Sequence, residues 1–122
     1  MNRLNGTTEP RRVDKPWGYE LIWAHTDRYV AKILHVNAGH ALSLQYHERK
    51  DETLYLLNGE MRFWAGMSAE SLEQIPFPAG RCFHVKTGTV HRMEAVTDID
   101  IIEASTPELD DVVRLEDRYG RT

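Results

Sequence analysis

Short apolar runs, each cut off by glycine, proline or asparagine, make up most of this chain of 122 residues. Residues 29–36 include apolar residues at both odd and even positions, which is typical of a strand covered on both faces. Asn58-Gly59 joins two further runs and predicts a hairpin, because both turn residues tolerate positive φ. No stretch predicts a long helix, and residues 110–117 could form one or two helical turns. Further strands are expected at 41–47, 53–57, 60–64, 83–85, 92–95 and 99–104.

Many short strands with glycine and proline between them predict an all-β domain, either a sandwich or a barrel. The length of the chain fits one domain with a single core. Residues 1–14 are polar and turn-prone, as expected of an arm or a disordered terminus. We therefore expect a flexible N-terminal arm at residues 1–12 and the folded domain at residues 13–122.

Composition and charge exclude several classes of partner. Hydrophobic residues make up 41% of the chain and charged residues 28%, as in ordinary globular domains. The net charge of −4 argues against general nucleic-acid binding, which needs a basic face. No apolar run has the length of a signal peptide core or a membrane span, so no membrane association is expected. The single cysteine, Cys82, cannot form an intrachain disulfide and indicates a reducing, cytoplasmic location.

A group of donor side chains favours a site for a divalent metal ion. Gln45 and His47 are two residues apart, so on a strand they point from the same face. Glu52 shares its face with Leu54 and Leu56, which directs it inward, and a buried carboxylate needs a partner. Two imidazoles and a carboxylate that converge on one point can bind such an ion. The candidate ligands are Gln45, His47, Glu52 and His91.

The spacing of these residues resembles the two-part cupin motif, in which a histidine is usual at the place of Gln45. Its parts are Gly39-x5-Gln45-x-His47-x4-Glu52-x6-Gly59 and Gly80-x7-Gly88-x2-His91. Further segments make the resemblance sharper, and over residues 13–121 the chain is similar to the cupin domain of type II phosphomannose isomerases. That domain forms the C-terminal half of bifunctional mannose-1-phosphate guanylyltransferase/mannose-6-phosphate isomerases. The segments are Pro16-Trp17-Gly18-Tyr19-Glu20, Leu42-Ser43-Leu44-Gln45-x-His47, Gly88-Thr89-Val90-His91-Arg92 and Glu116-Asp117-x-Tyr119-Gly120-Arg121.

The resemblance selects among the folds and implies a function. It implies a cupin, a double-stranded β-helix or jelly-roll-like barrel with one divalent metal ion inside. Zinc is our first choice from the mixed nitrogen and oxygen ligands, followed by manganese, iron and nickel. The implied activity is aldose–ketose isomerisation of a phosphorylated hexose, as from mannose 6-phosphate to fructose 6-phosphate. Lys32 and Glu103 are then candidates for the acid or base, and Lys50, Arg92 and Arg114 are candidates for binding the phosphate.

The pattern alone leaves two orientations open for the Lys32 side chain. It shares a strand face with Val30 and Leu34, and an inward lysine needs an anion nearby. If the opposite face is the core, Lys32 is simply solvated. The family carries a lysine at this place, which favours the inward orientation.

Departures from the family pattern keep other functions open. Lys50 stands where arginine is usual, and arginine is the better bidentate ligand for phosphate. A non-catalytic, metal-dependent cupin that binds a sugar or sugar phosphate is the first alternative. A cupin oxygenase is the second, although Gln45 replaces a histidine that such a site would use. We also expect a homodimer with Trp17 or Tyr19 near the contact, because this aromatic segment has little local core to join.

Overall fold

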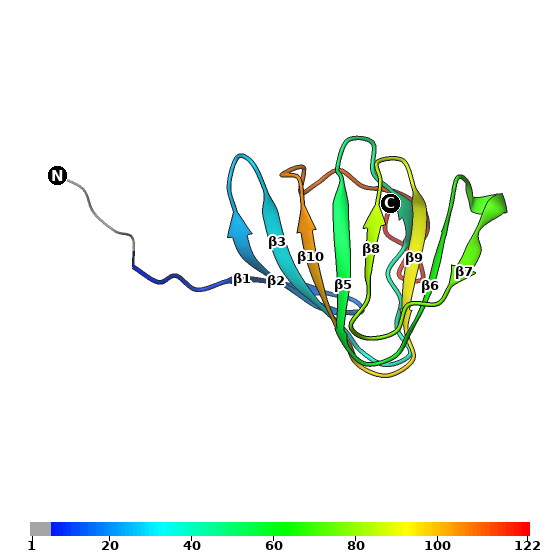
Figure 1. Cartoon of the computed structure of the whole chain (residues 1–122), viewed down its shortest axis with the longest axis horizontal. Coiled ribbons are helices and arrows are strands. Elements are labelled where there is room, and N and C mark those ends of the chain that lie inside the picture. Colours follow the sequence, from blue (N-terminus) through cyan, green and yellow to red (C-terminus); the bar gives the residue numbers. More distant parts are fainter. Residues whose placement is uncertain (1–5) are drawn as a thin grey trace.

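The computed structural model describes residues 6–122 as two antiparallel β-sheets that face each other (Figure 1). In spatial order, the first sheet contains β1 (Arg11–Lys15), β2 (Gly18–His25), β3 (Val30–Val36), β10 (Ile99–Ser105), β5 (Glu52–Asn58) and β8 (Cys82–Val85). The second contains β11 (Val113–Glu116), β4 (Leu44–Tyr46), β9 (Val90–Ala95), β6 (Met61–Gly66) and β7 (Glu73–Ile75). The described part of the chain has one helical turn, the 3₁₀ helix η1 (Ala69–Ser71). The all-β prediction is therefore confirmed.

No helix within residues 6–122 is both long enough and apolar enough to cross a membrane.

Three segments differ from the sequence prediction. Residues 110–117 were expected to form a helical turn, but they contain the edge strand β11, which pairs with β4. Residues 18–25 form β2, which the pattern did not predict. Residues 11–15 form β1 beside β2, so residues 11 and 12 lie in a strand rather than in an arm. The partner of β11 is distant in the chain, whereas β1 is polar and β2 pairs with its sequence neighbours β1 and β3. Residues 1–5 of the predicted arm lie outside the described residues.

The predicted hairpin between β5 and β6 is present and depends on its glycine. Gly59 has φ 89°, in the left-handed region. A Cβ atom at this position would lie 2.3 Å from the carbonyl oxygen of Asp98. Both the backbone conformation and the close approach therefore require glycine.

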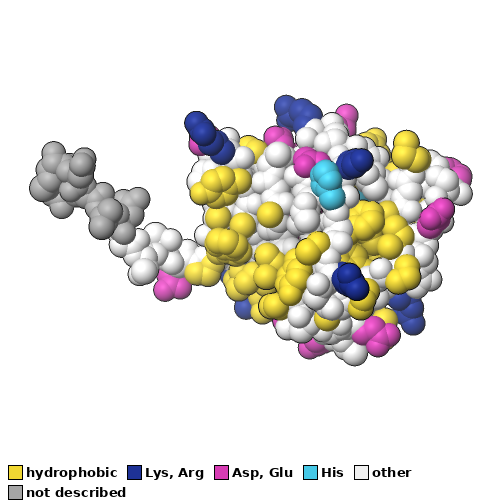
Figure 2. Space-filling view, viewed as in Figure 1, with side chains coloured by type: hydrophobic (Ala, Val, Ile, Leu, Met, Phe, Trp, Pro, Cys, Tyr) yellow, Lys and Arg dark blue, Asp and Glu magenta, His cyan; other side chains and the backbone are white. Residues whose placement is uncertain are grey.

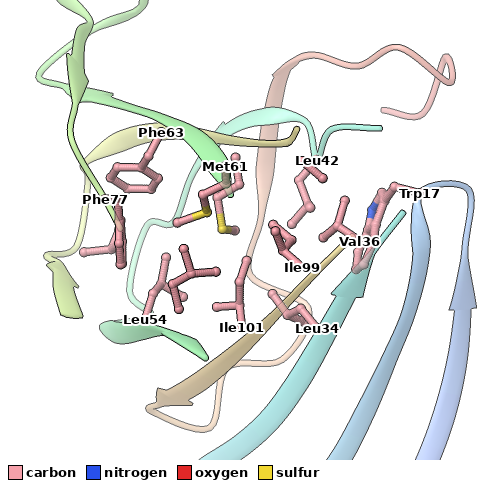
Figure 3. Close-up of a cluster of buried hydrophobic side chains, with 14 of the residues drawn as sticks. Trp17, Leu34, Val36, Leu42, Leu54, Met61, Phe63, Phe77, Ile99 and Ile101 are labelled. Atoms are coloured by element: carbon pink, nitrogen blue, oxygen red, sulfur yellow. The ribbon is translucent and has the colours of Figure 1, made fainter. Parts of the chain in front are cut away.

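The hydrophobic core fills the space between the two sheets (Figure 3). Phe63 of β6 is fully buried and makes edge-to-face contacts with Phe77 and Phe83, at centroid distances of 5.2 and 4.8 Å. Leu34, Leu54 and other inward residues of the six-stranded sheet pack with them. Burial of this apolar surface is the main source of stability. The cluster contains Trp17, Leu34, Val36, Leu42, Leu54, Leu56, Met61, Phe63, Ala65, Phe77, Val85, Met93, Ala95, Ile99 and Ile101.

Trp17 is a core residue and not a contact residue. Its side chain is only 2% exposed and lies beside Val36 and Leu42 (Figure 3). The expectation that Trp17 lies near a dimer contact is therefore wrong. Local sequence showed an aromatic segment, but not the cavity between the sheets that it fills. Tyr19, two residues on, is half-buried and stacks on His35.

The outer face of the six-stranded sheet carries an apolar row. The strand registers place Leu21 opposite Ile33, Ile33 opposite Ile102, and Ile102 opposite Tyr55. All of these side chains are partly exposed. Figure 2 shows hydrophobic side chains over much of the visible face of the molecule, between scattered charged residues.

Candidate metal centre

Two imidazoles and a carboxylate meet in the interior at the polar end of the two sheets. His47 follows β4, Glu52 begins β5 and His91 is the second residue of β9. The Nε2 atoms of His47 and His91 lie 3.4 and 3.3 Å from the same carboxylate oxygen, Glu52 Oε2. All three side chains are buried, and their donor atoms lie within 4.8 Å of one another. The structure thus brings together three of the four predicted ligands.

Hydrogen bonds fix which nitrogen of each imidazole faces this point. His47 Nδ1 donates to the carbonyl oxygen of Asp111 at 2.6 Å, and His91 Nδ1 donates to that of Thr89 at 2.9 Å. Because a carbonyl oxygen only accepts, Nδ1 carries the proton in each neutral ring and Nε2 keeps its lone pair. Both Nε2 atoms are buried without a hydrogen-bond partner within residues 6–122. Two such lone pairs beside a carboxylate are the donor set that a divalent cation needs.

A chain of buried charges leads away from the two imidazoles. Lys50 Nζ lies 3.1 Å from Glu52 Oε1 and 3.0 Å from Glu103 Oε2. Lys32 Nζ lies 3.4 Å from Glu20 Oε2 and 3.9 Å from Glu103 Oε2. Two ammonium groups therefore face three carboxyl groups in the interior. With all groups ionised, one negative charge remains uncompensated there, which favours binding of a cation.

The surroundings of the carboxyl groups shift their pKa values in opposite directions. Burial alone would raise the pKa of Glu52, but the imidazoles, when they carry a proton on Nε2, and the Lys50 ammonium outweigh it and hold this pKa well below its usual value. Burial and the charge of Glu52 together raise the pKa of Glu103. Burial disfavours the charged form of Lys50, yet Glu103 and Glu52 raise its pKa. Glu52 is thus ionised, while the pKa of Glu103 is shifted toward neutral pH.

A cavity of about 240 Å³ lies next to these groups. Lys32, Glu52 and Glu103 line it, together with residues of β1 and of the C-terminal segment. A cavity with convergent polar groups at one end is the usual form of a small-molecule site. Its charged and amide-bearing residues are Arg11, Lys15, Glu20, Lys32, Gln45, His47, Lys50, Glu52, Glu103, Asp110, Asp111, Arg114 and Arg121.

Gln45 lines the cavity beside the two imidazoles. It pairs with His91 in the register of β4 and β9. Its side-chain oxygen accepts a hydrogen bond from the Ser43 hydroxyl at 2.6 Å. A carbonyl oxygen has a second lone pair, so this bond leaves one free. The role of Gln45 as a fourth ligand stays a prediction.

Of the three predicted phosphate-binding residues, one points away from the cavity and one lines it but is already paired. Arg92 follows His91 on β9, and successive side chains of a strand point to opposite faces. It therefore leaves the cavity and approaches Glu116 at 3.5 Å. Lys50 is 4% exposed and held between two carboxylates, so its charge is already compensated. Arg114 does line the cavity.

Arg114 differs from Arg121, another cation of the cavity, in its partners. One guanidinium nitrogen donates to the carbonyl oxygen of Thr122 at 2.9 Å. Its Nε is buried without a hydrogen-bond partner within the described residues. Arg121, by contrast, is paired with Asp117 at 2.8 Å. Among the described residues Arg114 thus has no carboxylate side chain as a partner, a feature that it shares with Arg11 and Lys15 of the cavity.

Sequence reasoning missed the contribution of β1 to the cavity. Arg11, Val13 and Lys15 line it, whereas Arg12 and Asp14 pair with each other at 2.9 Å outside it. Val13 is the one apolar residue of β1, so the segment has no hydrophobic alternation that would predict a strand. Asp111 was also missed, and nothing in the local sequence distinguishes it from Asp110.

Comparison with known proteins identifies the relatives of this chain. The family model described as "Mannose-6-phosphate isomerase C-terminal" matches residues 2–117. The chain is 34% identical over 117 residues to mannose-1-phosphate guanylyltransferase ManC of Salmonella typhimurium, covering 91% of this chain and 23% of that protein. It is 30% identical over 118 residues to the xanthan biosynthesis protein XanB of Xanthomonas campestris pv. campestris, covering 92% and 24%. The chain thus spans about a quarter of the length of these relatives.

Solved structures share the fold. KdgF from Halomonas sp. superposes with a TM-score of 0.67 at 24% identity, covering 82% of this chain and 90% of that one. Oxalate decarboxylase of Lactobacillus farciminis superposes with a TM-score of 0.73 at 16% identity, covering 87% and 33%. These similarities confirm the predicted cupin jelly-roll.

Proposed function

This chain belongs to the mannose-6-phosphate isomerase C-terminal family, and on that premise we propose that it is a metal-dependent aldose–ketose isomerase of a phosphorylated hexose. The reaction would be of the mannose 6-phosphate to fructose 6-phosphate type. One observation carries the proposal. Two buried imidazole lone pairs and an ionised carboxylate lie beside a cavity that also holds a buried acid–base candidate and an arginine.

His47, Glu52 and His91 would hold one divalent ion, with Gln45 as the fourth ligand. This donor set fits zinc first, and manganese, iron or nickel next. The ion supplies Lewis-acid stabilisation of the negative charge that develops on the sugar oxygens. The chain's own contribution is to keep the Nε2 atoms unprotonated through the two Nδ1 hydrogen bonds.

Glu103 is our candidate for the general base. The isomerisation moves a proton between C2 and C1 of the sugar through an enediolate, which requires a group that accepts and returns it. Glu103 lines the cavity, is not among the three clustered metal ligands, and has a raised pKa. A base with a pKa nearer to neutral transfers protons efficiently in both directions. Lys32, 3.9 Å from Glu103, would position this carboxylate and serve as a source of positive charge.

Arg114 would bind the phosphate of the sugar. It reaches the cavity from β11, where it lies opposite Gln45 of β4 in the five-stranded sheet, whereas Glu103 comes from β10 of the six-stranded sheet. The phosphate would then lie on the side of the cavity opposite the candidate base. Arginine binds phosphate through two parallel N–H donors, which fixes orientation as well as affinity.

An isomerase assay on the metal-loaded protein tests the proposal. We expect conversion of mannose 6-phosphate to fructose 6-phosphate, and a loss of about 10²–10⁴-fold in kcat for Glu103→Gln. Glu94→Gln is the matched control, because Glu94 lies on the surface and pairs with Arg118. No conversion of any of a panel of hexose phosphates by a metal-loaded, folded wild type would refute the proposed activity.

One observation favours a second candidate function, metal-dependent binding of a sugar or sugar phosphate without catalysis. The Lys50 ammonium lies 3.1 Å from the ligand Glu52 and 3.0 Å from the candidate base Glu103. A cation held against the base weakens its ability to accept a proton. Tight binding of mannose 6-phosphate without turnover would support this function. Oxygen consumption in the same assays would instead indicate a cupin oxygenase.

A homodimer in the cytoplasm remains our expectation for the state of the protein. The row formed by Leu21, Ile33, Ile102 and Tyr55 supports it, because it offers a continuous apolar strip on one sheet face. Sedimentation at tens of micromolar protein, roughly the range in which stable interfaces persist, should give twice the monomer mass of 14.1 kDa. A monomer under these conditions would contradict it.

A further inference from the structure

The loop between two of the metal ligands is held by a single carboxylate. Residues 48–50 connect His47 to the segment that begins with Glu52. The amide of Glu48 donates to Asp111 Oδ1 at 3.1 Å. The amides of Arg49 and Lys50 donate to Asp111 Oδ2 at 2.7 and 2.8 Å. Three consecutive amides that point at one anion form a backbone nest, which charge-assisted hydrogen bonds stabilise.

Asp111 also acts on the metal ligand itself through its backbone. Its carbonyl oxygen accepts the Nδ1 proton of His47 at 2.6 Å. This bond decides that Nε2 of His47 carries the lone pair that faces Glu52 and His91. One residue therefore sets the tautomer of a ligand with its carbonyl and the conformation of the adjacent loop with its carboxylate.

Asp111 belongs to the strap, which we define as residues 106–112 between β10 and β11. In Figure 1 the orange to red part of the chain crosses here from the six-stranded to the five-stranded sheet. The strap is anchored near its start, where Thr106 exchanges hydrogen bonds with the backbone of Asp51 at 3.0 Å. The loop is thus fixed at both ends by one short segment that lies more than 50 residues further along the chain.

The turn before β9 fixes the same loop from the other side. The Gly88 amide donates to the carbonyl oxygen of His47 at 2.9 Å, and the Thr87 hydroxyl reaches the carbonyl oxygens of Arg49 and Lys50 at 3.3 Å. This turn also holds His91 through the carbonyl oxygen of Thr89. It does not set the tautomer of His47, which depends on the strap alone.

We propose that Asp111 is the positioning residue of the metal centre, a role that rests on the proposed metal site at His47, Glu52 and His91. Its carboxylate fixes the loop that spaces two of the ligands, and its carbonyl oxygen selects the tautomer of one of them. Without the carboxylate, the strap loses three hydrogen bonds to the loop. The carbonyl oxygen of Asp111 is then no longer fixed beside Nδ1 of His47. The metal ligands remain, but their spacing and tautomer are no longer fixed in advance.

Metal affinity, measured by competition with a chromophoric chelator, tests this role. Asp111→Ala should weaken Zn²⁺ binding by about 10–100-fold, the usual effect of removing a group that orients a metal ligand. Asp111→Asn should weaken it less, because the amide oxygen can still accept from part of the nest. Asp110→Asn is the matched control, because it removes the same charge from the neighbouring cavity-lining residue, whose side chain makes no hydrogen bond among residues 6–122. This control should bind within about twofold of wild type.

Two further measurements separate positioning from general support of the fold. The visible spectrum of the Co²⁺-substituted protein should change in the Asp111 variants and not in Asp110→Asn, because it reports ligand geometry. Thermal unfolding of the metal-free proteins measures stability independently. Lower stability with unchanged Zn²⁺ affinity and an unchanged Co²⁺ spectrum would overturn the proposal. If Asp111→Ala does not fold, Asp111→Asn decides by the same criteria, and a wild type that binds no metal would refute the metal site itself.

Discussion

The two ends of the space between the sheets are built from the same strands and have opposite character. On β3, Lys32 is followed by the inward residues Leu34 and Val36, and on β10, Glu103 is preceded by Ile101 and Ile99. The register pairs Glu103 with Lys32, Ile101 with Leu34, and Ile99 with Val36. Between β3 and β10 each inward row is therefore of one character, although the flanking strands do not extend it, since Leu54 of β5 lies opposite Glu103 and Ile22 of β2 lies opposite Lys32. One step along these two strands, from the pair Ile101 and Leu34 to the pair Glu103 and Lys32, therefore leads from the hydrophobic core to the charged site.

This arrangement explains how a small domain can hold a buried charged site. The apolar end, with Phe63 and Ile101 fully buried, supplies hydrophobic stabilisation. The polar end, with Lys32 and Glu103 almost as buried, costs free energy unless its charges are paired. The rigid apolar end fixes the positions of the strands, and the same strands then position the ligands and the candidate base.

The largest effect on stability is expected at the apolar end. Phe63→Ala should lower the free energy of unfolding by about 3–5 kcal/mol, because it removes a buried ring and leaves a cavity. Urea denaturation measures this change, and Trp23→Ala is the control, since Trp23 is 56% exposed. The metal affinity of the folded Phe63→Ala protein should stay close to that of wild type. A loss of less than about 1 kcal/mol would contradict the division of the interior into a stabilising end and a functional end.

A smaller effect, on binding rather than stability, is expected at the cavity wall. Arg114→Ala should weaken binding of mannose 6-phosphate by roughly ten- to a hundredfold, the equivalent of about 1.5–3 kcal/mol for a charge-assisted hydrogen bond. Calorimetric titration measures the affinity, and metal content should not change. Arg92→Ala is the matched control, because Arg92 points away from the cavity. Equal losses for the two variants would contradict the assignment of Arg114 to the site.

The smallest effect is expected at the Asp117–Arg121 pair of the C-terminal segment, which follows β11 and belongs to neither sheet. The Arg121 guanidinium outweighs partial burial and holds the pKa of Asp117 at about 2, below its ordinary value of 3.8. The pair therefore stabilises the folded state at pH values above 3.8, the ordinary pKa of the carboxyl group. This contribution disappears as the pH falls to about 2. Asp117→Asn should lower the free energy of unfolding by at most about 1 kcal/mol near neutral pH, since Arg121 is partly exposed.

Denaturation of wild type and Asp117→Asn over a series of pH values checks this window. The difference between the two proteins should narrow once the pH falls below about 4, where Asp117 begins to be protonated in the unfolded chain. Asp14→Asn, at an exposed pair with Arg12, is the control and should show no resolvable difference. A difference that grows with acidity would contradict the assigned direction of the pKa shift.

The sequence predicted the strands whose inward residues are apolar, and it missed the polar edge strands β1 and β11 together with β2. The runs at residues 29–36, 53–57 and 99–104 are β3, β5 and β10 because burial imposes a readable pattern. The polar strands β1 and β11 lie at sheet edges, where one side has no partner strand and the pattern is weak. Edge strands are therefore recognisable mainly from their register with β2 and β4.

For the site too, local pattern predicted some features, while contacts between distant segments decide the others. Spacing and parity predicted that His47, Glu52 and His91 converge, and the structure brings them together. The alternation of side chains along a strand could also have excluded Arg92 from the cavity, because it directly follows the inward His91. No local pattern could reveal that Lys50 pairs with Glu103, or that Asp111 holds the loop, because these contacts join segments about 50 or more residues apart.

The most direct test of the account is the metal content of the purified protein and of single histidine variants after dialysis against a chelator and reloading. Elemental analysis of wild type should give about one divalent ion per chain, as expected of a single closed donor set. His47→Ala and His91→Ala should each lose it, while His84→Ala should keep it, because His84 is exposed and pairs with Asp51 at 2.8 Å. Full metal content in either His47→Ala or His91→Ala, or none in wild type, would contradict the central claim that these buried imidazoles form a metal centre.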